Sequence, residues 1–152
     1  MNQQSGRSLI EVIGAIAIAG LMTASAVGMY SMIKSNQERN FASATIEQIA
    51  QDVKTLMEMQ GTYEGVSVTY LIKQGALQSD VPPIGGQGWS VVSSADGQSF
   101  SINLVDLTAN DCNFLTSNKP QWAAAILVNG FEAGIAENCF ETATNQVSFI
   151  VE

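Results

Sequence analysis

The chain has 152 residues, of which 46% are apolar and only 13% charged, with a formal net charge of −8 and no histidine. This length suffices for one membrane-spanning helix and one compact domain of roughly 90 residues. The acidic balance offers no basic surface to neutralise phosphates, so we expect no nucleic-acid partner. The chain has no histidine, and its two well-separated cysteines make no zinc cluster. We therefore expect that the chain is not an enzyme and that it binds no metal or other cofactor.

An uncharged, mostly apolar run from Val12 to Ile33, here called the apolar segment, follows directly after Glu11. As a helix rising about 1.5 Å per residue, it would extend roughly 33 Å and cross a bilayer's hydrocarbon core. An ionised side chain at the edge of such a segment costs free energy and indicates a functional partner. A cleavable secretory signal is disfavoured because Met1–Gly6 has no cation and the run is too long. A plain anchor for an unrelated domain remains an alternative.

The helical pattern continues past Ile33 with apolar residues three and four positions apart. This stripe consists of Ala42, Ile46, Ile49, Val53 and Leu56. No proline occurs before Gly61, which is a natural helix stop. We therefore predict one helix from about residue 8 to residue 60, with an amphipathic half from 34 to 60. A helix of roughly 80 Å is too long for so small a domain to bury, so its first half needs lipid or other copies of the chain.

Small residues recur four apart in the apolar segment, at Gly20, Ala24 and Gly28. Such a face lets helix backbones approach closely in lipid. Gly14, Gly20 and Gly28 also weaken the helix, each by up to about 1 kcal/mol relative to alanine. We predict a helix-packing face at these four residues, with the ordinary frequency of glycine in membrane helices as the alternative.

Residues 61–152, here called the cap, have mixed helix and strand signals that predict an α+β domain. We expect a helix over 67–74, with a strand as the alternative, and a turn-rich loop over 81–88. Strands at 89–93 and 99–104 flank a turn at Asp96-Gly97 and predict an antiparallel hairpin, with Phe100, Ile102 and Leu104 on its buried face. We further expect a helix over 108–116, a buried strand over 124–128, a turn at Asn129-Gly130, and a last strand over 146–151.

Cys112 and Cys139 both follow the apolar segment, so an oxidising compartment would pair them; two buried free thiols are the alternative. Gly85–Gly88 is interpreted as a loop without phosphate-binding character because no lysine follows it. Five carboxylates could gather around calcium, but their spacing matches no Ca²⁺ loop, so we expect solvated surface. They are Asp106, Asp111, Glu132, Glu137 and Glu141.

The N-terminal stretch Gly6-Arg7-Ser8-Leu9-Ile10-Glu11-Val12 resembles the prepilin motif of type IV pilins and pseudopilins. The resemblance implies a leader of residues 1–6, cleavage after Gly6 by a prepilin peptidase, and a mature chain that begins at Arg7. It also implies that the new α-amino group of one subunit neutralises Glu11 of its neighbour in a filament. Two features differ from the family, which usually begins its mature chain with a large apolar residue and has cations in its leader. Arg7 could keep the cationic role or pair with Glu11 itself.

The order of features in the cap narrows this resemblance. The order resembles that of type IVb pilins, the group that contains toxin-coregulated pilin and the thin-pilus pilins of conjugative plasmids. It consists of a helix with Cys112, then Val128-Asn129-Gly130, then Cys139 and a closing strand. The short leader is unlike that group. The implied fold is a long N-terminal helix, about 8–60, packed on an antiparallel sheet with short helices.

The resemblance implies a pilin that is held in the bacterial inner membrane as a precursor, with its cap in the periplasm, and then polymerises into an extracellular filament. Its implied partners are further copies of itself, the prepilin peptidase, the inner-membrane pilus assembly machinery, and membrane lipid before assembly. A minor pilin or a type II secretion pseudopilin is the first alternative, and a monomeric, membrane-anchored binding domain is the second.

Overall fold

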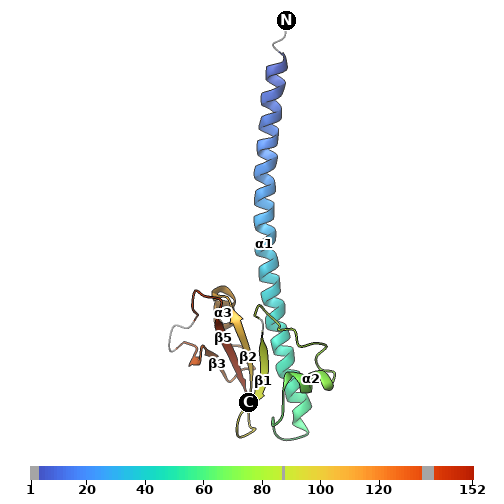
Figure 1. Ribbon diagram of the computed structural model, residues 1–152, viewed down its shortest axis with the longest axis vertical. Coiled ribbons are helices and arrows are strands. Elements are labelled where there is room, and N and C mark those ends of the chain that lie inside the picture. Colours follow the sequence, from blue (N-terminus) through green and yellow to red (C-terminus); the bar gives the residue numbers. More distant parts are fainter. Residues whose placement is uncertain (1–3, 87, 135–138) are drawn as a thin grey trace. The chain divides into compact units, whose positions relative to one another are not determined.

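Figure 1 shows the computed structural model of the chain, which describes residues 4–86, 88–134 and 139–152; the side chains of residues 4–9 and of Leu21 fall outside the description. The chain divides into two compact units, residues 1–38 and residues 39–152. Helix α1 (Gln4–Glu58) contributes to both units.

Helix α1 begins earlier than predicted and ends close to the predicted stop. The prediction placed its start near Ser8, but no proline precedes that residue, and Gly6 alone costs a helix only about 1 kcal/mol. At the other end, Gly61 takes a φ of +69° and donates its N–H to the carbonyl oxygen of Met57 at 3.2 Å. This left-handed conformation favours glycine and satisfies a carbonyl that the helix leaves without a partner.

The second unit contains a five-stranded sheet in which every neighbouring pair is antiparallel. Its strands are β1 (Trp89–Ser93), β2 (Phe100–Leu107), β3 (Ala125–Val128), β4 (Phe131–Glu132) and β5 (Asn145–Val151). The spatial order is β1-β2-β5-β3-β4, so the last strand of the chain lies in the middle of the sheet.

One face of this sheet shares a single hydrophobic core with the C-terminal part of α1 (Figure 1). In register across the sheet, Ile102 lies opposite Phe149, and Phe149 lies opposite Ile126, and all three are buried. The α1 stripe that faces them is buried as predicted at Ala42, Ile46, Ile49 and Val53, and Met57 takes the next place. Leu56 is only partly buried. Met57, four residues after Val53, points nearer the centre of the stripe than Leu56, three residues after Val53.

Two short helices complete the cap. Helix α2 (Val68–Lys73) confirms the helical interpretation of that stretch, and the hydroxyl of Ser67 caps it by accepting the N–H of Tyr70 at 3.1 Å. Helix α3 (Ala109–Thr116) lies in the predicted range and begins at the capping residue Thr108.

The turns at Asp96-Gly97 and Asn129-Gly130 form as predicted. Gly97 has a φ of +67°, and the N–H of Ser94 donates to the carbonyl of Ser99 at 2.8 Å to close the first hairpin. Asn129 and Gly130 both have positive φ, as a two-residue hairpin turn of the I′ type requires. This second turn reverses the chain into β4, a two-residue strand that the prediction did not include.

Candidate functional site

The apolar segment of α1 is exposed along its whole length within the first unit. Every residue from 10 to 33 whose side chain the structure describes is exposed, including Ile16, Met22 and Tyr30. Among the described residues, α1 is the one helix long and apolar enough to cross a membrane, judged by length and composition. So large an apolar surface indicates contact with lipid or with protein.

Hydroxyl side chains within this segment bond to the helix itself. Thr23 donates its hydroxyl to the carbonyl of Ala19 at 2.6 Å, and Ser31 donates to the carbonyl of Gly28 at 2.9 Å. These hydroxyls therefore enter an apolar environment without leaving a donor unsatisfied.

Glu11 is exposed and is the only charged residue between positions 10 and 33. None of the side chains that the structure describes forms an ion pair or a hydrogen bond with its carboxylate. The predicted cleavage site at Gly6 and Arg7 lies on the α1 backbone, one helical turn before Glu11, and the Arg7 side chain lies outside the described part of the chain. The Glu11 carboxylate is thus the group of the apolar surface that most needs an external partner.

The predicted packing face is open. A methyl group added to Gly14, Gly20 or Gly28 would meet nothing within 4 Å, and Ala24 is exposed. No described side chain fills these positions, so an approaching helix backbone has room there.

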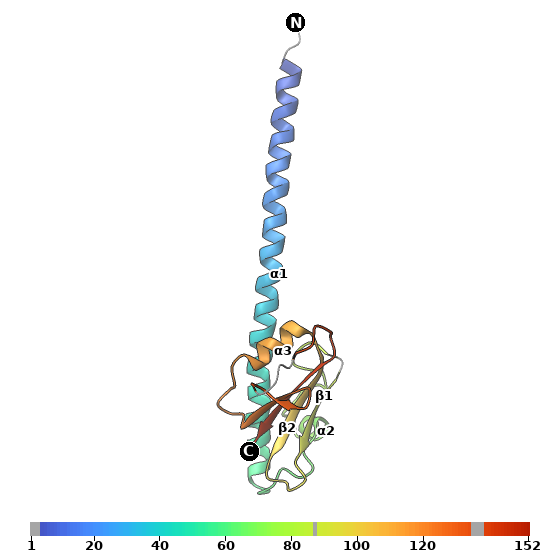
Figure 2. The same ribbon diagram turned by 90° about the vertical axis from the view of Figure 1, so that its left-hand side faces the viewer.

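A partly buried ion pair joins α1 to α3 within the second unit. Arg39 donates its Nε–H to Oδ1 of Asp111 at 2.8 Å, and the two side chains are only 20% and 16% exposed. The other oxygen of Asp111 accepts the hydroxyl of Thr108 at 2.7 Å, while the Thr108 hydroxyl accepts the N–H of Asp111 at 3.2 Å. Asp111 therefore both stabilises the start of α3 and holds α3 to α1. The two helices lie beside each other in both views (Figures 1 and 2).

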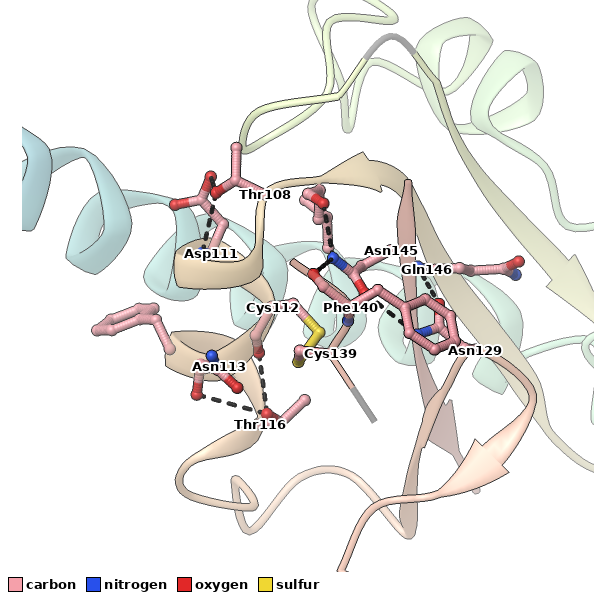
Figure 3. The surroundings of a disulfide bond; sticks show 12 residues. Thr108, Asp111, Cys112, Asn113, Thr116, Asn129, Cys139, Phe140, Asn145 and Gln146 are labelled. Carbon is pink, nitrogen blue, oxygen red and sulfur yellow. Dashed lines mark hydrogen bonds between the residues drawn. A yellow bond between two sulfur atoms is a disulfide. The ribbon is translucent and has the colours of Figure 1, made fainter. Parts of the chain in front are cut away.

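The residue after Asp111 forms a disulfide bond. Cys112 on α3 is bonded to Cys139, as the sequence predicted, with their Cα atoms 5.8 Å apart (Figure 3). Cys112 is fully buried in the core. The bond ties the stretch before β5 to α3.

Asn145 also fixes the stretch between Cys139 and β5, through hydrogen bonds of its side chain. Its side chain is completely buried, and its Nδ2 donates to the carbonyls of Leu107, Phe140 and Thr142 at 2.9–3.1 Å. Its Oδ1 accepts the N–H of Phe140 at 2.6 Å (Figure 3). One amide thus satisfies backbone groups from the end of β2 and from the loop that follows the disulfide.

Two other sequence features have structural roles. Gly86 packs against the backbone carbonyl of Val105 with a φ of +33°, a place where a side chain would collide. Among the described residues, no group of three or more acidic, cysteine or histidine side chains could hold a metal ion. Glu137, one of the five carboxylates considered for calcium, lies outside the described residues.

The Arg39–Asp111 pair and the Asn145 network escaped the sequence interpretation. The spacing of Thr108 and Asp111 indicates a helix start, but the partner of Asp111 lies 72 residues earlier in the chain. Asn145 stands directly before the predicted last strand and has no local signal of burial. Only the fold brings these groups together.

We compared the chain with known proteins. No protein-family model and no curated protein matches it. Among solved structures, the chain is similar to the crystal structure of TcpA, a type IV pilin from Vibrio cholerae El Tor biotype. The TM-score is 0.58 at 15% sequence identity, and the match covers 76% of this chain and 99% of that one. The chain therefore has the α+β fold of a type IV pilin, as the resemblance in its sequence implied.

Proposed function

We propose that this chain, which has a type IV pilin fold, is a structural subunit that polymerises into an extracellular type IV pilus, most like the type IVb group. The observation that carries the proposal is the exposed apolar segment with one carboxylate at its edge, that of Glu11, which pairs with none of the side chains that the structure describes. A monomer would leave this surface to lipid, whereas a polymer covers it with identical segments. The proposal assigns no catalytic residue and no cofactor.

Maturation begins in the inner membrane, where lipid covers the apolar segment and the cap faces the periplasm. A prepilin peptidase cuts after Gly6, and the pilus assembly machinery extracts the chain that begins at Arg7. The cut gives the first residue of the mature chain a free α-amino group. Before the cut, that nitrogen is an uncharged amide.

Glu11 then sets the axial register of the filament. When one apolar segment packs against others, its carboxylate leaves water and requires a cation, because an unpaired charge in apolar surroundings costs several kcal/mol. The α-amino group of a neighbouring subunit supplies this cation only when the two helices are staggered correctly. The wrong stagger leaves both charges unpaired, so the pair selects one register.

Arg7 gives this chain a second cation one turn before Glu11. A guanidinium stays protonated at any physiological pH, whereas an α-amino group loses its proton near pH 7.7–8.0. Arg7 of the same neighbouring subunit therefore keeps a cation beside Glu11 when the chain terminus loses its proton.

The open face at Gly14, Gly20, Ala24 and Gly28 supports close packing of these helices. Dispersion contacts and backbone approach replace the contacts with lipid. The cap, with its disulfide, forms the outer surface of the filament.

Electron microscopy of material sheared from cells, with mass spectrometry of its N-terminus, tests the proposal. We expect filaments built mainly of chains that begin at Arg7. Filaments that contain the chain in only a few copies would identify a minor pilin or a pseudopilin. A monomeric, membrane-bound chain that is never cut would identify an anchored binding domain and contradict the proposal.

A further inference from the structure

The second unit has a hollow on one flank of α1. Its volume is about 260 Å³, and it lies between Asn40 and Ser43 of α1, the end of α3 at Phe114, and the following loop at Asn118 and Trp122. The described residues that line this hollow include no charged side chain, although the chain has a formal net charge of −8. An apolar group can therefore enter without removing a charge from water. A benzene ring fits a cavity of only about 150 Å³ in another protein, so the volume of this hollow suffices for a phenyl ring.

The neighbouring residue on α1 offers such a ring. Phe41 is 74% exposed, although Ala42, the next residue, is completely buried. An exposed phenylalanine on the amphipathic part of the helix contributes nothing to the core, and its ring is available to a partner.

The hollow and the ring lie on opposite flanks of one helix. Successive helical residues point about 100° apart, which places Asn40 and Ser43 on one side of the buried stripe and Phe41 on the other. Ala42 and Ile46 lie between them, buried against the sheet. The ring of Phe41 therefore cannot reach the hollow of its own chain.

We propose that Phe41 of one copy inserts into the hollow of the next copy. This contact deepens the proposed function, on which it rests, by naming a cap-to-cap interface of the filament. A projection on one flank and a hollow on the other form a head-to-tail interface, which repeats without limit unless the rotation closes a ring. The two features also lie within a few residues along α1, so a copy packed alongside meets them at nearly the same level.

Two other exposed phenylalanines make the choice of Phe41 testable. Phe131 on β4 is 65% exposed, and Phe140 follows the disulfide and is 55% exposed. Neither lies on α1. Phe131 is therefore the matched control.

The first experiment compares substitutions at the two rings in the full-length chain, solubilised in detergent and crosslinked over a range of concentrations. Phe41→Ala should raise the concentration at which half of the chain is crosslinked by about tenfold or more, and Phe41→Leu by less. Phe131→Ala should leave it unchanged. Equal effects of Phe41→Ala and Phe131→Ala would overturn the contact.

The second experiment uses cysteine pairs in cells that express two tagged copies. Phe41→Cys in one copy and Asn118→Cys in the other should give a disulfide-linked heterodimer, whereas Phe131→Cys with Asn118→Cys should not. Filaments of normal yield without the first crosslink would overturn the contact and leave the proposed function standing. The crosslink in cells that never form filaments would support the contact and contradict the proposed function. Failure of the unsubstituted chain to form filaments, together with absence of the crosslink, would contradict both.

Discussion

Arg39 of α1 and Asp111 of α3 form a 2.8 Å hydrogen-bonded ion pair that is about four-fifths buried and lies one residue before the disulfide at Cys112. This pair fastens the amphipathic part of the long helix to the part of the cap that the disulfide crosslinks. The carboxylate also caps α3, so the loss of one partner disturbs both the anchor and the helix start.

Arg39→Gln should lower the free energy of unfolding by about 1–3 kcal/mol, because Asp111 remains partly buried with only its hydrogen bonds to Thr108. Urea unfolding of the detergent-solubilised chain, followed by tryptophan fluorescence, measures the change. The matched control is Lys34→Gln, which breaks the Lys34–Glu38 pair, whose side chains are 63% and 66% exposed. That control should cost less than about 1 kcal/mol. A cost for Arg39→Gln no larger than the control's would contradict a structural role for the pair.

Replacing Cys112 by serine should destabilise the second unit by roughly 3–4 kcal/mol in the chain-entropy model, since the bond closes a loop with a sequence separation of 27. The variant should be cut faster by protease in the periplasm. Alkylation of the exported wild-type chain without reductant checks the premise. Free thiols in that sample would show that the bond does not form in the cell.

Asn145→Ala should cost about 3 kcal/mol, because removal of the amide leaves the buried carbonyl of Leu107 and the partly buried carbonyls of Phe140 and Thr142 without this donor. Asn145→Asp should be worse at neutral pH, since a carboxylate cannot donate to three carbonyls. The exposed neighbour Gln146 provides a control, and Gln146→Ala should stay within about 0.5 kcal/mol. An unfolding free energy for Asn145→Ala equal to that of the control would show that water replaces these bonds.

The turn between β1 and β2 contains a carboxyl group, that of Asp96, whose pKa is lowered by hydrogen bonds. The Ser94 hydroxyl donates to the Asp96 carboxylate at 2.6 Å, and this bond, followed by the N–H of Gln98 at 3.1 Å, lowers the pKa of Asp96. A carboxyl with a lowered folded-state pKa stabilises the fold above its unfolded-state value, near pH 4, and the stabilisation is lost as the pH falls through the folded value. Ser94→Ala should therefore raise the Asp96 pKa, as measured by NMR titration of its carboxyl carbon. An unchanged titration would show that the hydroxyl does not bond to the carboxylate in solution.

Periodicity and turn residues sufficed for most elements of the fold. The alternation of Phe100, Ile102 and Leu104 located β2, and Asp96-Gly97 located its hairpin, because these signals are local. Strand order is different: β5 pairs with β2 and β3 across long connections, and alternation in a strand does not identify its neighbour. The two-residue β4 is too short to have a period.

The sequence could single out the N-terminal part of the candidate site because the chemistry there is local. A charge beside a long apolar run is anomalous wherever it occurs, which singled out Glu11. Arg39 and Asp111 each look like ordinary surface charges, and only their approach in the folded chain shows that they are partners. The hollow beside Asn40 and Ser43 likewise depends on three separate stretches of chain that meet in the fold.

The central claim is that the Glu11 charge drives ordered packing of the apolar segments, and filament yield from Glu11→Gln tests it most directly. Glu38→Gln, an exposed glutamate on the same helix beyond the apolar segment, is the matched control. We expect Glu11→Gln to remain inserted in the membrane with its disulfide formed, yet to give few or no filaments in sheared material, whereas Glu38→Gln assembles normally. Filaments of normal yield and length from Glu11→Gln would contradict the account.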